Sequence, residues 1–224
     1  MTPDAESAPR VLLVNLNRYT EPCPVYPVGL AHVAGALRHQ GFDTKIWDAL
    51  FPTQTLEECL ASYRPGFVGL ALRNVDNVQC QKPRSFIEDL LDFCRRIRSA
   101  TKAVLVLGGS GFSVFPKELY ELTRVDFGVE GEGEESLPRL LSALRSGGRY
   151  EDIPGLHYRK PGGAAACVPK AASGCAFDSE PWHDPELLGR YVAAGALPGV
   201  QTQRGCPLKC CYCTYPLIEG RRSR

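Results

Sequence analysis

The sequence has no excess of charge of either sign, because its 224 residues carry 26 basic and 25 acidic side chains. This balance gives no reason to expect nucleic acid or an anionic membrane surface as a partner. The sequence also lacks an apolar run near the roughly 20 residues that cross a bilayer, and it lacks the basic flank and apolar run of a secretory signal. We therefore expect a cytoplasmic protein whose partner is a small molecule.

Ten cysteines are present, and without a secretory signal they do not predict a disulfide framework. Six are scattered, but four lie within eight positions: Cys206, Cys210, Cys211 and Cys213. These four are too close together for ordinary mutual disulfides and are well placed to surround a metal. We expect reduced thiols.

Most of the chain alternates between short apolar runs and segments with helical periodicity. Strands are expected at 10–16, 44–47, 66–72, 103–107 and 125–129, and helices at 27–41, 55–63, 86–97, 116–122 and 134–144. Short glycine-rich turns join them. The pattern predicts an α/β fold, a doubly wound five-stranded parallel sheet of Rossmann or flavodoxin type.

The pattern changes after residue 146, which predicts three parts: a sheet domain at 1–146, a hairpin and linker at 147–197, and the start of a second domain at 198–224. The hairpin is expected to pair 155–159 with 164–169 around a turn that contains two glycines. A connecting segment is expected at 171–198. A short strand at 199–203 is then expected to lead into the cysteines.

The cysteine segment reads RGCPLKCCYC and contains the spacing CxxxCxxC. Three thiolates on one tight loop can each bind one iron of a 4Fe-4S cluster and leave the fourth iron open. A structural zinc site is an alternative, but no second CxxC or histidine pair completes four ligands. A redox dithiol at Cys210 and Cys213 would leave Cys206 unexplained.

This segment resembles the cluster loop of the radical SAM superfamily, which has the same spacing and an aromatic residue before its last cysteine, here Tyr212. The resemblance implies that Cys206, Cys210 and Cys213 bind the cluster and that Tyr212 lies beside the adenine of S-adenosylmethionine. It also implies that the cofactor chelates the open iron and is cleaved to a 5'-deoxyadenosyl radical. Cys211 fits no ligand position in this register and is expected to be a packing residue.

Two loops that follow expected strands are rich in glycine, GGSGFS at 108–113 and EGEGE at 130–134. Ligands of open parallel sheets bind at the carboxyl ends of the strands, and glycine lets the backbone approach a bulky ligand. Neither loop contains the GxxxxGK phosphate pattern, and no GxGxxG follows the first strand. The sequence therefore disfavours a simple nucleotide.

The segments PVGLAHVAGAL, LGGSGFSVFPKEL, DFGVEGEGEESLPRLLSAL and IPGLHYR resemble the cobalamin-binding domain that precedes many radical SAM domains. The likeness runs over residues 10–219. The cobalt-binding motif DxHxxG is absent, since His32 and Gly35 preserve only HxxG inside the first helix. We expect His32 to be an ordinary packed or surface residue and the lower face of the corrin to lack a histidine ligand.

The resemblance assigns cobalamin contacts to two groups of residues. The first group lies on the glycine-rich loops and comprises Gly108, Gly109, Ser110, Gly131 and Glu132; the second follows the third strand and comprises Asn74, Asp76 and Asn77, with Arg73 beside them. Each group has an alternative. The asparagines and aspartate can supply turn hydrogen bonds, the glycines a tight strand-to-helix turn, and Glu132 with Glu134 a favourable charge at the helix N-terminus.

The resemblance implies a radical methylase: a hydrogen is removed from an unactivated carbon of a small molecule or lipid, methylcobalamin supplies the methyl group, and an external donor supplies electrons. Other members of the family use the same cofactors for ring contraction or cyclisation. Residues 201–222 also resemble members that act in lipid or secondary-metabolite pathways. An α/β barrel of about 200 residues would follow the cluster loop, so we expect the chain to be incomplete and inactive alone, and we assign no catalytic residue. The alternatives are a non-catalytic cobalamin carrier or sensor, and an iron-sulfur redox protein without cobalamin.

Overall fold

The fold is built on one seven-stranded sheet with the strand order β2-β1-β3-β4-β5-β6-β7. A computed structural model describes residues 8–170 and 180–224 of the chain. The strands are β1 (Arg10–Asn15), β2 (Asp43–Asp48), β3 (Phe67–Ala71), β4 (Val104–Gly108), β5 (Phe127–Val129), β6 (Leu156–Arg159) and β7 (Ala165–Cys167).

The first five strands are parallel, which confirms the predicted doubly wound sheet. The hairpin of β6 and β7 is also confirmed, and it extends the same sheet because β6 pairs antiparallel with β5. Strand β1 lies between β2 and β3, so the winding direction reverses at β1 and β3. In sheets of this order, the reversal point is where ligands bind.

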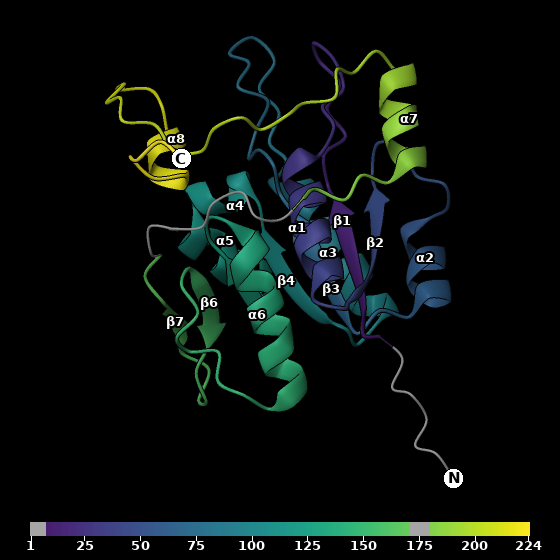
Figure 1. Cartoon of the computed structure of the whole chain (residues 1–224), viewed down its shortest axis with the longest axis vertical. Helices are drawn as coiled ribbons and strands as arrows, with labels where there is room; N and C mark the ends of the chain where they lie inside the picture. Colours follow the sequence, from purple (N-terminus) through teal and green to yellow (C-terminus); the bar gives the residue numbers. More distant parts are fainter. Residues whose placement is uncertain (1–7, 171–179) are drawn as a thin grey trace.

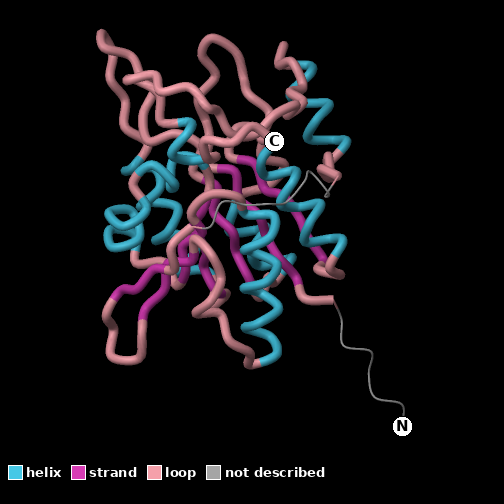
Figure 2. The backbone as a smooth tube through the Cα atoms, turned by 60° about the vertical axis from the view of Figure 1, so that its left-hand side comes forward, coloured by secondary structure: helices cyan, strands magenta, loops and turns pink. Residues whose placement is uncertain are grey.

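Helices cover both faces of the sheet (Figure 2). They are α1 (Val28–His39), α2 (Leu56–Tyr63), α3 (Ile87–Ala100), α4 (Ser110–Val114), α5 (Pro116–Thr123), α6 (Gly133–Ser146), α7 (Pro185–Ala193) and α8 (Tyr215–Ile218). Alternate residues of a strand point to opposite faces. Leu12 and Val14 accordingly pack with α2, α3 and α5, whereas Val11 and Leu13 pack with α1, α6 and α7.

Three helices were not expected from the sequence, namely α4, α7 and α8. Helix α7 falls in the expected connecting segment, of which residues 171–179 lie outside the described part of the chain. Its first turn is fixed by Asp184, whose Oδ1 accepts hydrogen bonds from the backbone N–H groups of Glu186 and Leu187. Leu187 and Tyr191 then bury one face of the helix against the sheet domain.

The strand expected at 199–203 was a wrong prediction, because these residues form no strand. The segment crosses the carboxyl ends of the sheet instead of lying along an edge strand (Figure 1). Within residues 8–170 and 180–224 it therefore has no neighbouring strand to pair with. The nearest equivalent is a single antiparallel pair, in which Arg204 and Arg224 exchange two backbone hydrogen bonds of 3.1 and 2.9 Å.

Within the described ranges, no helix is long and apolar enough to span a bilayer.

Candidate cofactor site

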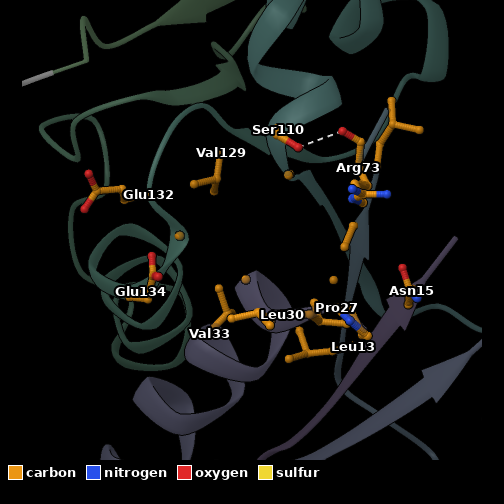
Figure 3. Close-up of a pocket in the computed structure, with 18 of the residues that line it drawn as sticks. Leu13, Asn15, Pro27, Leu30, Val33, Arg73, Ser110, Val129, Glu132 and Glu134 are labelled. Atoms are coloured by element: carbon orange, nitrogen blue, oxygen red, sulfur yellow. Dashed lines mark hydrogen bonds between the residues drawn. The ribbon is translucent and has the colours of Figure 1, made fainter. Parts of the chain in front are cut away.

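A cavity of about 410 Å3 opens at the carboxyl ends of β1, β3, β4 and β5. Its floor and walls are mainly apolar, and side chains from α1 and β1 face those that follow β4 and β5 (Figure 3). The apolar lining includes Leu13, Leu30, Val33, Val106, Val129 and Leu137. Because β1 and β3 both contribute, the cavity lies at the point where the winding direction reverses, as expected for a ligand site.

The loop after β4 is held tightly against the end of β3. Gly109 has φ +98°, and a Cβ there would lie 2.5 Å from the carbonyl oxygen of Leu72, so only glycine fits. The backbone N–H of Gly111 donates to that same oxygen at 2.9 Å. The hydroxyl of Ser110 donates to the carbonyl oxygen of Arg73 at 2.6 Å (Figure 3). The tight turn therefore brings bare backbone to the cavity.

The loops after β4 and β5 are also joined to each other. The Ser113 hydroxyl accepts a hydrogen bond from the N–H of Gly131 at 2.9 Å and donates to the carbonyl oxygen of Gly109 at 3.0 Å. Of the residues assigned to cobalamin from the sequence, Gly108, Gly109, Ser110, Gly131 and Glu132 all line the cavity. Their contact with a ligand stays a prediction, but the structure brings them together.

The second predicted group lies outside the cavity lining, where only Arg73 of that segment is found. Asp76 accepts a hydrogen bond from the N–H of Val78 at 2.8 Å. The Asn77 side chain accepts from the N–H of Arg84 at 2.9 Å and donates to the carbonyl oxygen of Lys82 at 2.8 Å. Asp76 and Asn77 thus make the turn hydrogen bonds that were the alternative, and Asn74 shares their loop. No contact between these three side chains and the cavity is present.

His32 is buried in α1, with 7% of its surface exposed, and it is not a cavity-lining residue. This agrees with its interpretation as a packed helical histidine. Among the cavity-lining residues of the described chain there is no histidine.

The cysteine loop projects from the sheet domain near α4 (Figure 1). Cys206 and Cys213 are partly buried, Cys210 and Cys211 are exposed, and Tyr212 is 86% exposed. In the described ranges, no three or more histidine, cysteine or acidic side chains gather as a metal-binding group. Metal binding at sites of this kind is coupled to folding of the site. The ligand role of the three cysteines stays a prediction.

The base of the loop is nevertheless closed. The N–H of Cys206 donates to the carbonyl oxygen of Gly220 at 3.0 Å. Gly205 has φ +77°, and a Cβ there would lie 2.1 Å from the carbonyl oxygen of Arg222. Only glycine allows this approach of the two chain segments. Three thiols on a short loop with closed ends fit the donor set of a three-cysteine iron-sulfur site.

A buried charge network connects the loop base to the cavity, and the sequence did not predict it. Arg204, 8% exposed, donates to Glu132 at 2.9 Å and also to Glu134. The guanidinium of Arg224 donates to the second oxygen of Glu132. The two glutamates flank the N-terminus of α6, so the predicted helix-charge role and the ion pairs coexist.

Two carboxyl groups in this region have shifted pKa values in opposite directions. Burial alone raises the pKa of Glu132, but hydrogen bonds and charge from Arg224 and Arg204 outweigh it, so the net pKa lies below its usual value. Burial also raises the pKa of Glu219, and here the arginines do not compensate. The Oε2 atom of Glu219 is buried and has no hydrogen-bond partner among the residues that the structure describes. Glu219 therefore retains its proton to a higher pH than an ordinary glutamate.

A second buried polar group holds α7 beside the cavity. Asp48, 3% exposed, accepts hydrogen bonds from Asn15 at 2.7 Å and from the Tyr191 hydroxyl at 3.0 Å. Its other oxygen accepts from the backbone N–H groups of Leu50 and Phe51. Asn15 itself lines the cavity, so this carboxylate fixes part of the cavity wall. The acid at the end of a strand was the only sequence signal for it.

The model of the B12 binding domain family matches residues 22–141, which is more than half of the chain. The chain belongs to the B12-binding domain family. The match covers α1, the strands β2 to β5 and most of α6, and therefore most of the elements that surround the cavity.

Several curated relatives extend this result. The chain is 28% identical to a tryptophan 2-C-methyltransferase of Streptomyces laurentii, over 94% of this chain and 44% of the relative. It is 26% identical to a hopanoid C-3 methylase of Methylococcus capsulatus, over 88% of this chain and 37% of the relative. The chain spans less than half the length of these relatives.

Solved structures support the same grouping. A radical S-adenosylmethionine methyltransferase, TsrM, from Kitasatospora setae with cobalamin and a [4Fe-4S] cluster bound superposes with a TM-score of 0.81 at 28% identity, covering 96% of this chain and 43% of that one. The cobalamin-dependent S-adenosylmethionine radical enzyme OxsB superposes with a TM-score of 0.73 at 20% identity, covering 92% of this chain and 28% of that one, and shows a common fold. The resemblance to cobalamin-binding radical SAM proteins is thus confirmed.

Proposed function

We propose that this chain supplies the cobalamin-binding part and the cluster loop of a cobalamin-dependent radical SAM methylase that acts on an unactivated carbon of a small molecule or lipid. The observation that supports this proposal is the open apolar cavity at the point where the winding direction of the sheet reverses. One wall of this cavity is formed by the base of the cysteine loop. A cofactor in the cavity and a cluster on the loop would therefore be neighbours. The proposal also requires an external electron donor.

The cavity fits the planar apolar surface of a corrin better than it fits a simple nucleotide. Its lining is mainly apolar, its polar contacts include backbone at Gly108 and Gly109, and its walls carry the acidic pair Glu132 and Glu134. Both glutamates are paired with arginines, Arg204 and Arg224, so this wall carries little net charge. The Ser110 hydroxyl, at the cavity edge, can accept hydrogen bonds from the amides at a corrin's rim.

The residues of this chain would bind and orient, and the cofactors would supply the chemistry. Cys206, Cys210 and Cys213 would hold the cluster through their thiolates, and Tyr212 would cover the adenine of S-adenosylmethionine. When bound, the three cofactors provide one-electron chemistry and a transferable methyl group. Apolar side chains such as Leu30 and Val129 would exclude water from the face of the corrin.

The test is anaerobic reconstitution with iron and sulfide, followed by incubation with hydroxocobalamin and gel filtration. We expect broad iron-sulfur absorbance together with corrin bands in the protein fraction. Cys206→Ala should lose the cluster absorbance and retain the corrin bands, whereas Cys211→Ala is the matched control and should retain both.

The other outcomes point to different functions. Corrin bands without a cluster in the unaltered chain indicate a cobalamin carrier, and cluster absorbance without corrin indicates an iron-sulfur redox protein. Either result contradicts the proposal. The retention of full cluster absorbance in Cys206→Ala would contradict the ligand assignment.

A further inference from the structure

Residues of the cysteine-loop base form one wall of the cavity. Gln201, Arg204, Ile218 and Glu219 line the cavity together with Glu132, at the end of the loop after β5, and Glu134, in the first turn of α6. The segment before the cysteines and the segment after them therefore both contact the space in which a ligand of the sheet domain would lie. This arrangement makes the cavity incomplete without the loop base.

Arg204 is the residue that connects these parts. Its guanidinium donates to Glu132 and Glu134 at the start of α6 and to the side-chain oxygen of Gln201, which lies 3.1 to 3.2 Å away. It is also separated from Cys206 by a single glycine whose conformation excludes a side chain. A movement of the cysteine loop therefore also moves the cavity wall, because the planar guanidinium of Arg204 fixes both the direction and the distance of its hydrogen bonds to the two glutamates.

A second contact holds the other side of the loop base. The Lys170 ammonium donates to the carbonyl oxygen of Ile218 at 2.9 Å, at the end of α8, and lies 3.8 Å from Glu130. Glu130 immediately precedes the cavity-lining loop and also contacts buried His157 at 3.3 Å. Both ends of the cysteine loop are thus tied to residues 130–134.

On this geometry, and on the basis of the proposed function, we propose that Arg204 is a positioning residue that couples the two cofactor sites: cluster binding on the cysteine loop strengthens cobalamin binding in the cavity, and cobalamin strengthens cluster binding by the same factor. Binding of either cofactor fixes the position of the Arg204 guanidinium, which lines the cavity and lies two residues before Cys206. The second cofactor then meets a wall whose arrangement is already set, and less of its binding free energy is used to set it. Reciprocity follows from thermodynamic linkage.

The experiment measures the dissociation constant of hydroxocobalamin by equilibrium dialysis, on apo protein and on anaerobically reconstituted protein. Coupling of ordinary size predicts that the cluster strengthens binding about 5- to 150-fold in the unaltered chain. In Arg204→Gln the ratio should fall close to one, and Arg204→Lys, which keeps the charge but not the fork, should give an intermediate ratio. Arg222→Gln is the matched control, because it removes the same charge from an exposed position of the same loop base, and its ratio should be unchanged.

Arg204→Gln removes a positive charge that pairs with the buried carboxylates of Glu132 and Glu134, so the folding of this variant must be checked by circular dichroism. The double variant Glu134→Gln with Arg204→Gln removes one charge of each sign and leaves Glu132 with Arg224. It should fold and show the same loss of coupling. If the unaltered chain binds no cobalamin in either state, the proposed function itself fails. If it binds both cofactors with a ratio of one, or if a folded Arg204 variant keeps the full ratio, the coupling proposal is overturned and the proposed function stands.

Discussion

Gly29 offers a way to fill the cavity without disturbing the fold. It lies in the first turn of α1, it lines the cavity, and a Cβ at this position would meet no atom within 4 Å. A phenyl ring carried by Gly29→Phe extends into the space that a ligand would use. Since glycine is a poor helix former, the exchange should stabilise α1 by about 0.5 kcal/mol, which corresponds to a rise in melting temperature of about 1 to 2 °C for a domain of this size.

The effect on binding should be much larger and of opposite sign. A buried phenylalanine covers on the order of 150 Å2 or more of surface. If half of that area is taken from contact with the ligand, then at about 25 cal/mol per Å2 the binding free energy falls by about 2 kcal/mol, or roughly twentyfold in affinity. Equilibrium dialysis with hydroxocobalamin measures the affinity, and thermal unfolding measures the stability.

Gly189→Phe is the matched control for this experiment. Gly189 is likewise an exposed helical glycine with open space around its Cβ, but it lies on α7 and does not line the cavity. The control should leave cobalamin affinity unchanged. Unchanged affinity in Gly29→Phe, with a normal melting temperature, would refute the placement of cobalamin in this cavity.

Three further changes test other parts of the structure. Tyr191→Phe removes one hydrogen bond to the buried carboxylate of Asp48, so it should cost about 1 to 2 kcal/mol of unfolding free energy, and an unaltered denaturation midpoint would contradict that role. Gly205→Ala should lower the free energy of unfolding by about 1 to 3 kcal/mol from backbone strain alone, and it should reduce the iron that the protein retains after reconstitution. Full retention of iron would show that cluster binding does not need a closed loop base. Burial raises the pKa of Glu219 in the folded state, so the stability that its protonated form contributes is fully present below the ordinary pKa of 4.5 and is lost as pH rises through the raised value. Glu219→Gln should therefore flatten the dependence of the unfolding free energy on pH between 4.5 and 7. Parallel profiles for the variant and the unaltered chain would contradict the burial effect.

The sheet was predictable because local signals and tertiary packing agree. Runs such as those of β1 and β3 are apolar on both faces, and they are buried by helices on both sides. Pro27 and Gly41 bound the helix expected at 27–41, and Thr55, where the next helix was expected to begin, forms a capping box with Glu58 in the structure. Such signals act over a few residues, so a single sequence is enough to read them.

The strand expected at 199–203 failed because strand formation needs a neighbour, and nothing in a sequence says that this segment crosses the ends of the sheet. Helix α7 was missed because the prolines at 181, 185 and 198 favoured an irregular connecting segment, although Asp184 and Pro185 are an N-cap and a first-turn residue. Local signals for this helix existed but were outweighed.

Some residues of the candidate site could likewise be predicted from the sequence, and others could not. The glycines at 108, 109 and 131 were predictable because loops after parallel strands meet at one edge of the sheet. The pairing of Arg204 with Glu132, 72 residues apart in sequence, was not predictable, because it depends on how the C-terminal segment returns to the sheet. An arginine directly before the cluster loop and an acidic loop after β5 were separate observations until the fold joined them.

The most direct test of the account is the composition of one anaerobically reconstituted, cobalamin-treated sample of the chain. Iron, acid-labile sulfide, zinc and corrin are measured on the same protein after gel filtration. The account predicts about four iron and four sulfide per chain, together with stoichiometric corrin and negligible zinc. Stoichiometric zinc with no iron, no sulfide and no corrin would contradict it.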